Sequence, residues 1–344
     1  MIIATQDRMH VGPATALAQK GYHMLLEKPM APDVVSCRKI VAAVKAAGII
    51  FSVGHTLRYT RYTQALKLLV DSGAIGKVVS IEHLEPVGYW HYAHSFVRGN
   101  WCNESQSSFM LLAKSCHDLD WIYYILGAHC KSISSFGSLT HFRKENAPKG
   151  AGERCLDCDV EAECPYSAKK IYLKRAAEGD FGWPVNIVDP DCTYEGVLEA
   201  LRSGPYGRCV YSCDNYVVDH QVVNMEFAGG QTAVFSMIGM TEMDNRRTRL
   251  FGTRGQIEGD GTHIRHVDFL TDKVNTIDTS LTDAGRGAGH GGGDYWMMKR
   301  FLAAVAENDP GMVLSGPDDS LESHLMVFAA EKARRKHCIV EMDE

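Results

Sequence analysis

Apolar residues in the first fifty positions fall into short strand-like runs separated by stretches of helical period. The runs predict buried strands over residues 1–5, 24–26 and 49–53. Between them, the pattern predicts helices over about 12–20 and 34–47, and a glycine follows the second helix as a C-cap would. Strand, helix, strand, helix, strand is a pair of βα units, which indicates a parallel sheet covered by helices.

The pattern changes after about residue 60. A helix over about 63–71 is followed by an alternating strand at 78–85. Further strands are expected at 130–138, 208–211, 220–227, 232–240 and 249–251, and further helices near 117–126, 164–177, 295–306 and 320–335. Strands in runs without alternating helices favour antiparallel pairing. We therefore expect an α/β plus α+β protein: a partial Rossmann domain, part of a doubly wound parallel sheet, at 1–60, and a domain with a large, mostly antiparallel open sheet at 61–344.

Composition narrows the function classes. A chain of 344 residues with 45% hydrophobic residues has room for two cores. The net charge of −6, with Arg334–Lys336 as the longest basic cluster, argues against a nucleic-acid partner. No apolar run approaches the roughly 20 residues that span a bilayer. Eleven mostly scattered cysteines indicate reduced thiols, so we expect a cytoplasmic protein.

One tripeptide and several short motifs carry a family resemblance. Glu27-Lys28-Pro29 directly follows a predicted strand, at the sheet edge where such folds bind ligands. The other motifs, in order, are Ala4-Thr5 with His10, Gly54-His55-Thr56-Leu57-Arg58-Tyr59, Ser72 to Val78, His117-Asp118-Leu119-Asp120 before Leu126-Gly127, and Gly252-Thr253-Arg254-Gly255. Together they cover nearly the whole chain, which resembles the Gfo/Idh/MocA oxidoreductases.

The resemblance implies catalytic roles for Lys28 and His117. Family members place this lysine at the nicotinamide end of NAD or NADP, near the reacting carbinol, and use the histidine as acid/base. Oxidation of an alcohol releases a proton that imidazole accepts near neutral pH, and an ammonium group stabilises the alkoxide. By the same resemblance, Thr5, His10 and Glu27 join Lys28 in binding the cofactor.

One position departs from the family pattern. The family usually has an aspartate four residues before the histidine, where this chain has Ala113. Lys114 stands three residues before His117, on the same face of a helical turn, and is expected to supply the missing polar group.

The segment 89–101 interleaves aromatic residues with hydrogen-bonding side chains. It is interpreted as a substrate loop, because stacking faces beside polar groups suit polyhydroxylated or acidic small molecules. Its candidate substrate contacts are His91, His94, Arg98, Asn100 and Trp101. The alternative is an aromatic core whose polar tips are satisfied internally.

The family's glycine-rich pyrophosphate turn does not occur in its usual place. The one Gly-x-Gly-x-x-Gly match, at Gly287, Gly289 and Gly292, is not flanked by a βαβ unit. It is interpreted as a structural loop or as a loop that closes on substrate with His290. We therefore expect a Rossmann domain truncated at its N-terminal side and weak cofactor binding.

Three cysteines form a local cluster. Cys155, Cys158 and Cys164 are spaced so that they could hold a structural zinc ion, with His141 as the nearest candidate for a fourth ligand. An iron–sulfur cluster and ordinary reduced thiols are the alternatives.

The resemblance predicts an NAD(P)-dependent oxidoreductase of a sugar, polyol or related small hydroxylated substrate. Two alternatives are a non-catalytic protein that binds or forms oligomers, and a redox-assisted, NAD-dependent glycosidase. Family relatives cover the open sheet face with a second subunit, so a homodimer or homotetramer is expected.

Overall fold

The computed structural model describes residues 1–280 and 289–342. The α-helices are α1 (Val11–Gln19), α2 (Val34–Ala47), α3 (Arg61–Asp71), α4 (Tyr89–Tyr92), α5 (Met110–Ala113), α6 (Cys116–Leu126), α7 (Lys174–Ala177), α8 (Val185–Val188), α9 (Tyr194–Ser203), α10 (Gly293–Glu307) and α11 (Pro317–Lys336). The strands are β1 (Ile2–Ile3), β2 (Met24–Leu26), β3 (Phe51–Val53), β4 (Val78–Pro86), β5 (Cys130–Ser138), β6 (His220–Phe227), β7 (Thr232–Ile238), β8 (Arg247–Gly252), β9 (Gly255–Gly259), β10 (His263–Asp268), β11 (Val274–Asp278) and β12 (Val340–Glu341).

Strands β1, β2 and β3 form a parallel sheet in that order, as the βα pattern predicts. Helix α2 begins where Asp33 accepts a hydrogen bond from the backbone N–H of Ser36, and it ends at Gly48, whose φ of 60° is left-handed. Ile40 and Val44 of this helix are buried with Met24 and Val53 of the strands. The two expected βα units are therefore confirmed.

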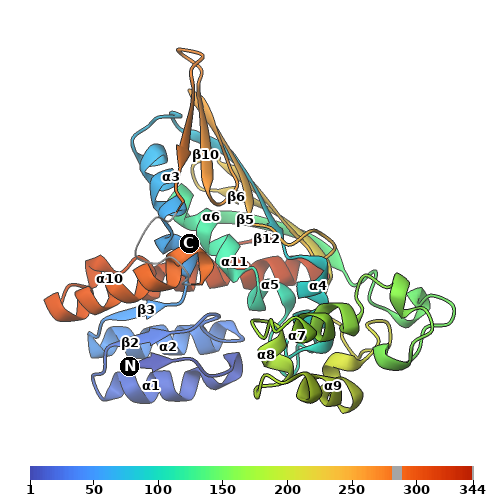
Figure 1. Cartoon of the computed structure of the whole chain (residues 1–344). Helices are drawn as coiled ribbons and strands as arrows, with labels where there is room; N and C mark the ends of the chain where they lie inside the picture. The colour runs from blue at the N-terminus through green and yellow to red at the C-terminus, as the bar shows by residue number, and fades with distance from the viewer. Residues whose placement is uncertain (281–288, 343–344) are drawn as a thin grey trace.

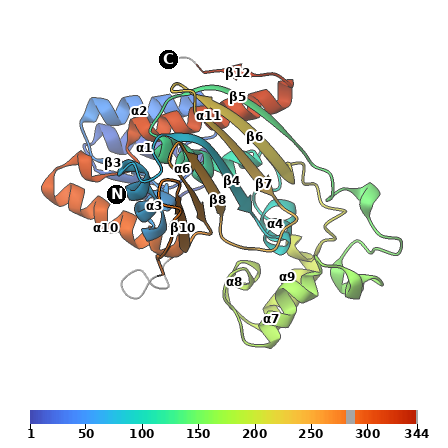
Figure 2. The same ribbon diagram turned by 90° about the horizontal axis from the view of Figure 1, so that it is seen from above.

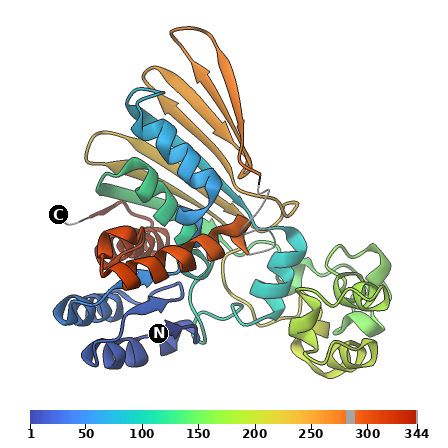
Figure 3. The same cartoon turned by 60° about the vertical axis from the view of Figure 1, so that its left-hand side comes forward.

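The second sheet contains nine strands within the described residues, in the order β11-β10-β9-β8-β4-β7-β6-β5-β12. The pair of β4 and β7 is parallel and the other pairs are antiparallel. Helices α3 and α6 lie against the same face of the fanned sheet (Figure 3). The expected fold class, a Rossmann-like parallel sheet followed by a large, mostly antiparallel sheet, is confirmed.

The last two long helices return to the parallel sheet. Helix α11 lies between the two sheets (Figure 1) and packs Leu321 and Phe328 against the core of the first one. Met297 and Phe301 of α10 are buried with Leu25. The end of the chain thus covers the parallel sheet, and a domain division at residue 60 stays a prediction.

Residues between β5 and β6 form a separate lobe beside the sheet. Helices α7, α8 and α9 lie away from the sheets in Figures 1 and 2 and have a small core of their own. The strand expected at 208–211 is wrong: within the described residues, this segment makes a single β-bridge, between Arg154 and Arg208. An apolar run of that length does not fix strand pairing, and Cys209, Val210 and Tyr211 are instead buried in the main core of the large sheet.

Candidate active site

Lys28 lies at the carboxyl end of β2, half-buried, and its Nζ donates a hydrogen bond to the carbonyl of Ala113 at 2.9 Å. The neighbouring strand approaches closely at Gly54, where a Cβ atom would lie 2.9 Å from Glu27 Oε2. This close approach explains the glycine. The parallel sheet therefore presents a lysine directly at the segment that precedes His117.

His10 is fully buried beneath the same loop. Its Nδ1 lies 2.9 Å from the carbonyl oxygen of Pro29, and its Nε2 lies 3.0 Å from that of Thr5. The imidazole thus ties the loop after β1 to the loop that carries Lys28. Thr5 is exposed at this edge and Glu27 is half-buried, and the cofactor contacts expected of these residues and of His10 stay predictions.

His117, in the first turn of α6, is only 3% exposed, and neither ring nitrogen has a hydrogen-bond partner among the described residues. Burial lowers its pKa well below the usual value, and the positive charge of Lys28 and the ring of His290 lower it further. The ring centroids of His117 and His290 are 5.6 Å apart. His117 is therefore a neutral, unpartnered imidazole beside a cation.

Lys114 belongs to a buried charge network. Its Nζ lies 3.2 Å from Glu85 Oε1, and Arg246 Nε lies 2.9 Å from the other oxygen of the same carboxylate. Burial lowers the pKa of Lys114; Glu85 opposes this effect, and Arg246 adds to it. The expectation that Lys114 supplies a polar group for catalysis at His117 stays a prediction.

Arg246 Nε also donates a hydrogen bond to Asp118 Oδ1 at 2.6 Å. His83 Nε2 lies 3.1 Å from the same oxygen. Burial would raise the pKa of Asp118, but Arg246 and His83 outweigh burial and hold it below its usual range. The His83 ring stacks on Trp121 with centroids 4.8 Å apart. Asp118, in the first turn of α6, is thereby linked to β4 through His83 and to the segment before β8 through Arg246.

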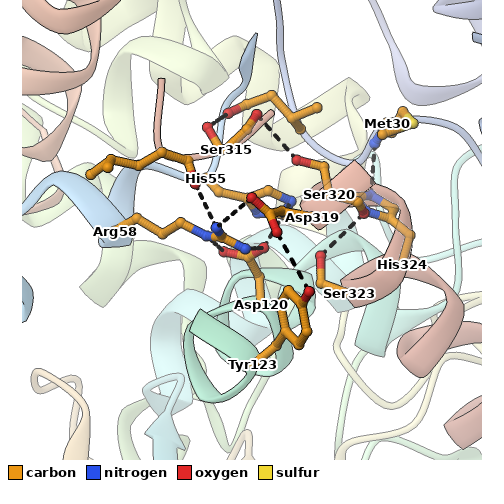
Figure 4. Close-up of polar contacts among 12 residues, drawn as sticks. Met30, His55, Arg58, Asp120, Tyr123, Ser315, Asp319, Ser320, Ser323 and His324 are labelled. Atoms are coloured by element: carbon orange, nitrogen blue, oxygen red, sulfur yellow. Dashed lines mark hydrogen bonds and ion pairs between the residues drawn. The ribbon is translucent and has the colours of Figure 1, made fainter. Parts of the chain in front are cut away.

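A second buried pair holds the other side of α6. Arg58 donates to both oxygens of Asp120 at 2.7 Å, and both side chains are at most 2% exposed. His55 Nε2 lies 3.6 Å from Asp120 (Figure 4). Burial lowers the pKa of His55 to about 3 despite the opposing charge of Asp120.

His324 of α11 connects this cluster to the Lys28 loop. Its Nε2 accepts a hydrogen bond from the backbone N–H of Met30 at 2.9 Å, so Nδ1 carries the proton and donates to Ser320 O at 2.6 Å (Figure 4). Burial lowers its pKa, which agrees with a neutral ring. Helix α11 thus positions the loop that follows Lys28.

A cavity of about 340 Å³ lies beside this centre, between α3, β4 and the segments before β8, between β9 and β10 and after β11. Arg246 and His290 both line it, and each contacts the His117 segment on its other side. His290 Nδ1 also lies 3.1 Å from Asp294. Of the glycine-rich motif, Gly287 lies outside the described residues, whereas Gly289 and Gly292 directly precede α10.

The expected substrate loop, 89–101, divides into two parts. Half-buried His91 has a pKa of about 3, lowered by burial and then by Lys114. His94 Nδ1 lies 3.0 Å from the Tyr172 hydroxyl, and Arg98 Nε donates to the carbonyl of Arg208 at 2.8 Å. Those two side chains hold the lobe in place, while Asn100 and Trp101 are exposed. A substrate contact for any of the five stays a prediction.

The zinc site expected from three cysteines and His141 finds no support. His141 Nε2 lies 3.3 Å from the Tyr211 hydroxyl, and Cys209 joins Cys155, Cys158 and Cys164 around a small cavity of about 20 Å³. The four thiols are free. Among residues 1–280 and 289–342, no three histidine, cysteine or acidic side chains are grouped to hold a metal ion. The buried Arg98 guanidinium, 3.3 Å from Cys155 Sγ, places a cation where the metal was expected.

Sequence reasoning missed Glu85, Arg246 and His324 as parts of this site. Glu85 lies near the end of a predicted strand and Arg246 in a turn, and no motif spacing links either residue to His117. His55 and Arg58 were within a quoted motif but had no assigned role. Only the tertiary structure brings these residues together.

Two family models match the chain. The one described as the oxidoreductase family with an NAD-binding Rossmann fold matches residues 1–55, and the one described as the C-terminal alpha/beta domain of the Gfo/Idh/MocA oxidoreductase family matches residues 67–337. No helix among the described residues has the length and apolar character needed to cross a membrane.

Among curated proteins, the chain is 23% identical over 317 residues to the oxidoreductase YteT of Bacillus subtilis. This match covers 87% of this chain and 71% of YteT. The chain is 29% identical over 142 residues to the 2,7-anhydro-N-acetylneuraminate hydratase of Escherichia coli, covering 41% of this chain and 37% of the hydratase. These matches do not support the expected truncation or the impaired cofactor binding.

Solved structures share the fold. An oxidoreductase from Agrobacterium radiobacter in complex with NAD+, L-tartaric acid and magnesium superposes with a TM-score of 0.67 at 15% identity, over 99% of this chain and 79% of that one. A levoglucosan dehydrogenase in complex with NADH and levoglucosan gives a TM-score of 0.69 at 17% identity, over 100% of this chain and 80% of that one.

Proposed function

The chain belongs to the Gfo/Idh/MocA oxidoreductase family, and on that premise we propose that it is an NAD(P)-dependent oxidoreductase of a small hydroxylated substrate such as a sugar or polyol. The observation that carries the proposal is the buried imidazole of His117, which has no hydrogen-bond partner among the described residues and lies beside the lysine at the edge of the parallel sheet. A buried polar group without a partner costs stability, which is expected where a ligand supplies the partner.

The residues at the sheet edge fit a nicotinamide cofactor. Thr5 is exposed where β1 ends, and Glu27 and Lys28 are half-buried where β2 ends, so all three are at the carboxyl edge where Rossmann folds bind ligands. When bound, the nicotinamide would accept a hydride from the substrate carbon. We propose Thr5, Glu27 and Lys28 as its contacts, with His10 holding their two loops together.

The proton of the reacting hydroxyl goes to His117 in this proposal. Its ring is neutral at physiological pH, because burial and Lys28 disfavour the charged form, so a nitrogen lone pair is free to accept the proton. The ammonium groups of Lys28 and Lys114 stabilise the negative charge that develops on the oxygen. Glu85 forms ion pairs with Lys114 and Arg246, and Asp118 accepts a hydrogen bond from Arg246, so the two carboxylates fix the positions of both cations.

Turnover with Lys28→Ala tests the proposal. The purified chain is mixed with NAD or NADP and a panel of sugars and polyols, and the reduced nicotinamide is followed by absorbance. We expect turnover with at least one substrate and a loss of about 100-fold or more in Lys28→Ala. Lys39→Ala, an exposed lysine on α2, is the matched control. Unchanged turnover in Lys28→Ala contradicts the assignment.

Two finer expectations belong to this proposal. A cytoplasmic location follows from the cysteine usage, and a homodimer or homotetramer would cover the open face of the large sheet. The comparisons support neither the non-catalytic alternative nor the NAD-dependent glycosidase, and no observation on the described residues favours either of them.

A further inference from the structure

The cavity beside His117 has an unusual charge composition. Its lining includes Arg61 and Arg246, and none of the described residues that line it is an aspartate or a glutamate. Arg246 is paired with Glu85 and Asp118 behind the lining, whereas Arg61 has no carboxylate partner among the described residues, so the cavity carries one cation that no acid neutralises. A site of this composition is stabilised by an anion.

The guanidinium of Arg246 is held by one edge. Its Nε is directed at Asp118 and Glu85, whereas neither terminal nitrogen has a hydrogen-bond partner among the residues that the structure describes. The side chain is 20% exposed, and it lines the cavity. The buried carboxylates therefore fix the orientation of the fork and leave its other donors for a ligand.

Arg61 is the first residue of α3, and its half-buried side chain makes no hydrogen bond or ion pair to any residue in 1–280 or 289–342. A positive charge in the first turn opposes the helix dipole. Its position at the cavity is thus not explained by the stability of α3.

The remaining polar lining suits hydroxyl groups. Thr60, Thr63, Asn245, Thr262, Thr279 and Ser280 provide hydroxyl and amide groups around the two arginines. These groups both donate and accept hydrogen bonds, as the hydroxyls of a sugar require. A volume of about 340 Å³ is within the range of small-molecule pockets.

We propose that this cavity binds the carboxylate of a polyhydroxylated acid, so that the substrate is a sugar acid rather than a neutral sugar, with Arg61 and Arg246 as the residues that determine this specificity. The inference rests on the proposed function for the identity of the reacting centre. His290 and Arg246 border both the cavity and the His117 segment, and the proposal therefore places the reacting hydroxyl and the bound carboxylate on one molecule.

Calorimetric titration of the full chain tests the proposal without turnover. The ligands are three matched pairs of an acid and its neutral counterpart: galacturonate with galactose, glucuronate with glucose, and gluconate with glucitol. We expect at least one acid to bind about tenfold or more tightly than its counterpart, because a hydrogen-bonded charge pair contributes that much discrimination. If no acid is preferred, the proposal is overturned.

Arg61→Gln gives the matched comparison. This variant should lose most of the preference for the acid and keep the affinity for the neutral counterpart, and Arg38→Gln, an exposed arginine on α2, should change neither. A preference that survives Arg61→Gln overturns the role of Arg61. Equal oxidation of acids and neutral polyols would overturn this inference alone, whereas acid binding without any turnover would contradict only the oxidoreductase proposal.

Discussion

At the scale of single residues, the imidazole of His117 is the group whose surroundings define the site. It is buried without a hydrogen-bond partner among residues 1–280 and 289–342, and burial, with Lys28 and His290, keeps it neutral by lowering its pKa. A buried polar group without a partner costs stability rather than adding to it, so its replacement should affect chemistry more than folding.

We therefore expect His117→Ala to lower kcat by about 100-fold or more, because general base catalysis contributes about that much. The melting temperature should stay close to that of the parent chain, since no hydrogen bond is lost within the described residues. His263→Ala, an exposed histidine on β10, is the control and should leave kcat unchanged. Wild-type kcat in His117→Ala would remove this residue from the mechanism.

At the scale of elements, the Arg58–Asp120 pair joins the segment after β3 to α6. Arg58 also donates to the carbonyl of Leu314, just before α11, so one guanidinium connects three parts of the chain. Both partners are almost completely buried.

Removal of one partner should be costly. Arg58→Met leaves the Asp120 carboxylate buried without its partner, and we expect a loss of about 3–5 kcal/mol in the free energy of unfolding. The double variant Arg58→Met with Asp120→Leu should lose less, because no charge is stranded. The i, i+4 pair of half-buried Lys67 and exposed Asp71 is the control, at about 0.5 kcal/mol. Urea titrations compare the parent chain, the single variant, the double variant and the control, and a single variant as stable as the control would contradict the pairing argument.

At the scale of the whole molecule, several histidines are buried in their neutral form. Burial lowers the pKa of His55 and His91 to about 3 and that of His94 to about 4. In the unfolded chain each protonates near pH 6.5. The unfolded state therefore binds more protons below that pH, and the stability present above about pH 6.5 is lost as the pH falls toward 4.

Stability should thus fall by about 1.4 kcal/mol per pH unit for each such histidine between pH 6.5 and 4. Denaturant titrations at pH 7.5, 6 and 5 measure the slope. His55→Gln should reduce the slope by the contribution of one proton, about 1.4 kcal/mol per pH unit. His263→Gln, at an exposed position on β10, should leave the slope unchanged. Equal stability at pH 7.5 and pH 5 would show that these rings are not buried as neutral groups.

The large sheet leaves one face without a helix among the described residues, and a second copy of the chain is proposed to cover it. Val234 and Ile238 of β7 are half-buried there beside polar neighbours such as Ser236, and a broad depression of about 590 Å³ runs along β4, β7 and β8. This face is more polar than the sequence pattern indicated. It still presents a continuous surface for a partner.

Light scattering tests the assembly. We expect a mass of two or four chains, and Val234→Lys should shift it toward one chain, because a charge would be buried at the contact. Leu68→Lys, at a highly exposed position on α3, is the matched control and should leave the mass unchanged. A stable single chain in the parent protein would mean that the sheet face needs no second copy.

The sequence by itself determined the order of elements and the family. Local signals decided the helices and strands of residues 1–53: Asp33 and Gly48 bound α2 because capping is a contact between neighbours in the chain. Lys28 and His117 were found because their motifs are contiguous. The strand expected at 208–211 failed, because strand pairing depends on a partner distant in the chain.

Only the tertiary structure decided what surrounds those motifs. Arg246 is 128 residues from Asp118, and the N–H of Met30 donates to His324 across 294 residues. The fold also places His141 beside Tyr211 and Cys209 beside the other three thiols. The spacing of these residues along the chain predicts neither contact. Charge pairs and cavities are formed by side chains that meet after folding, so their pattern along the chain carries no local signal.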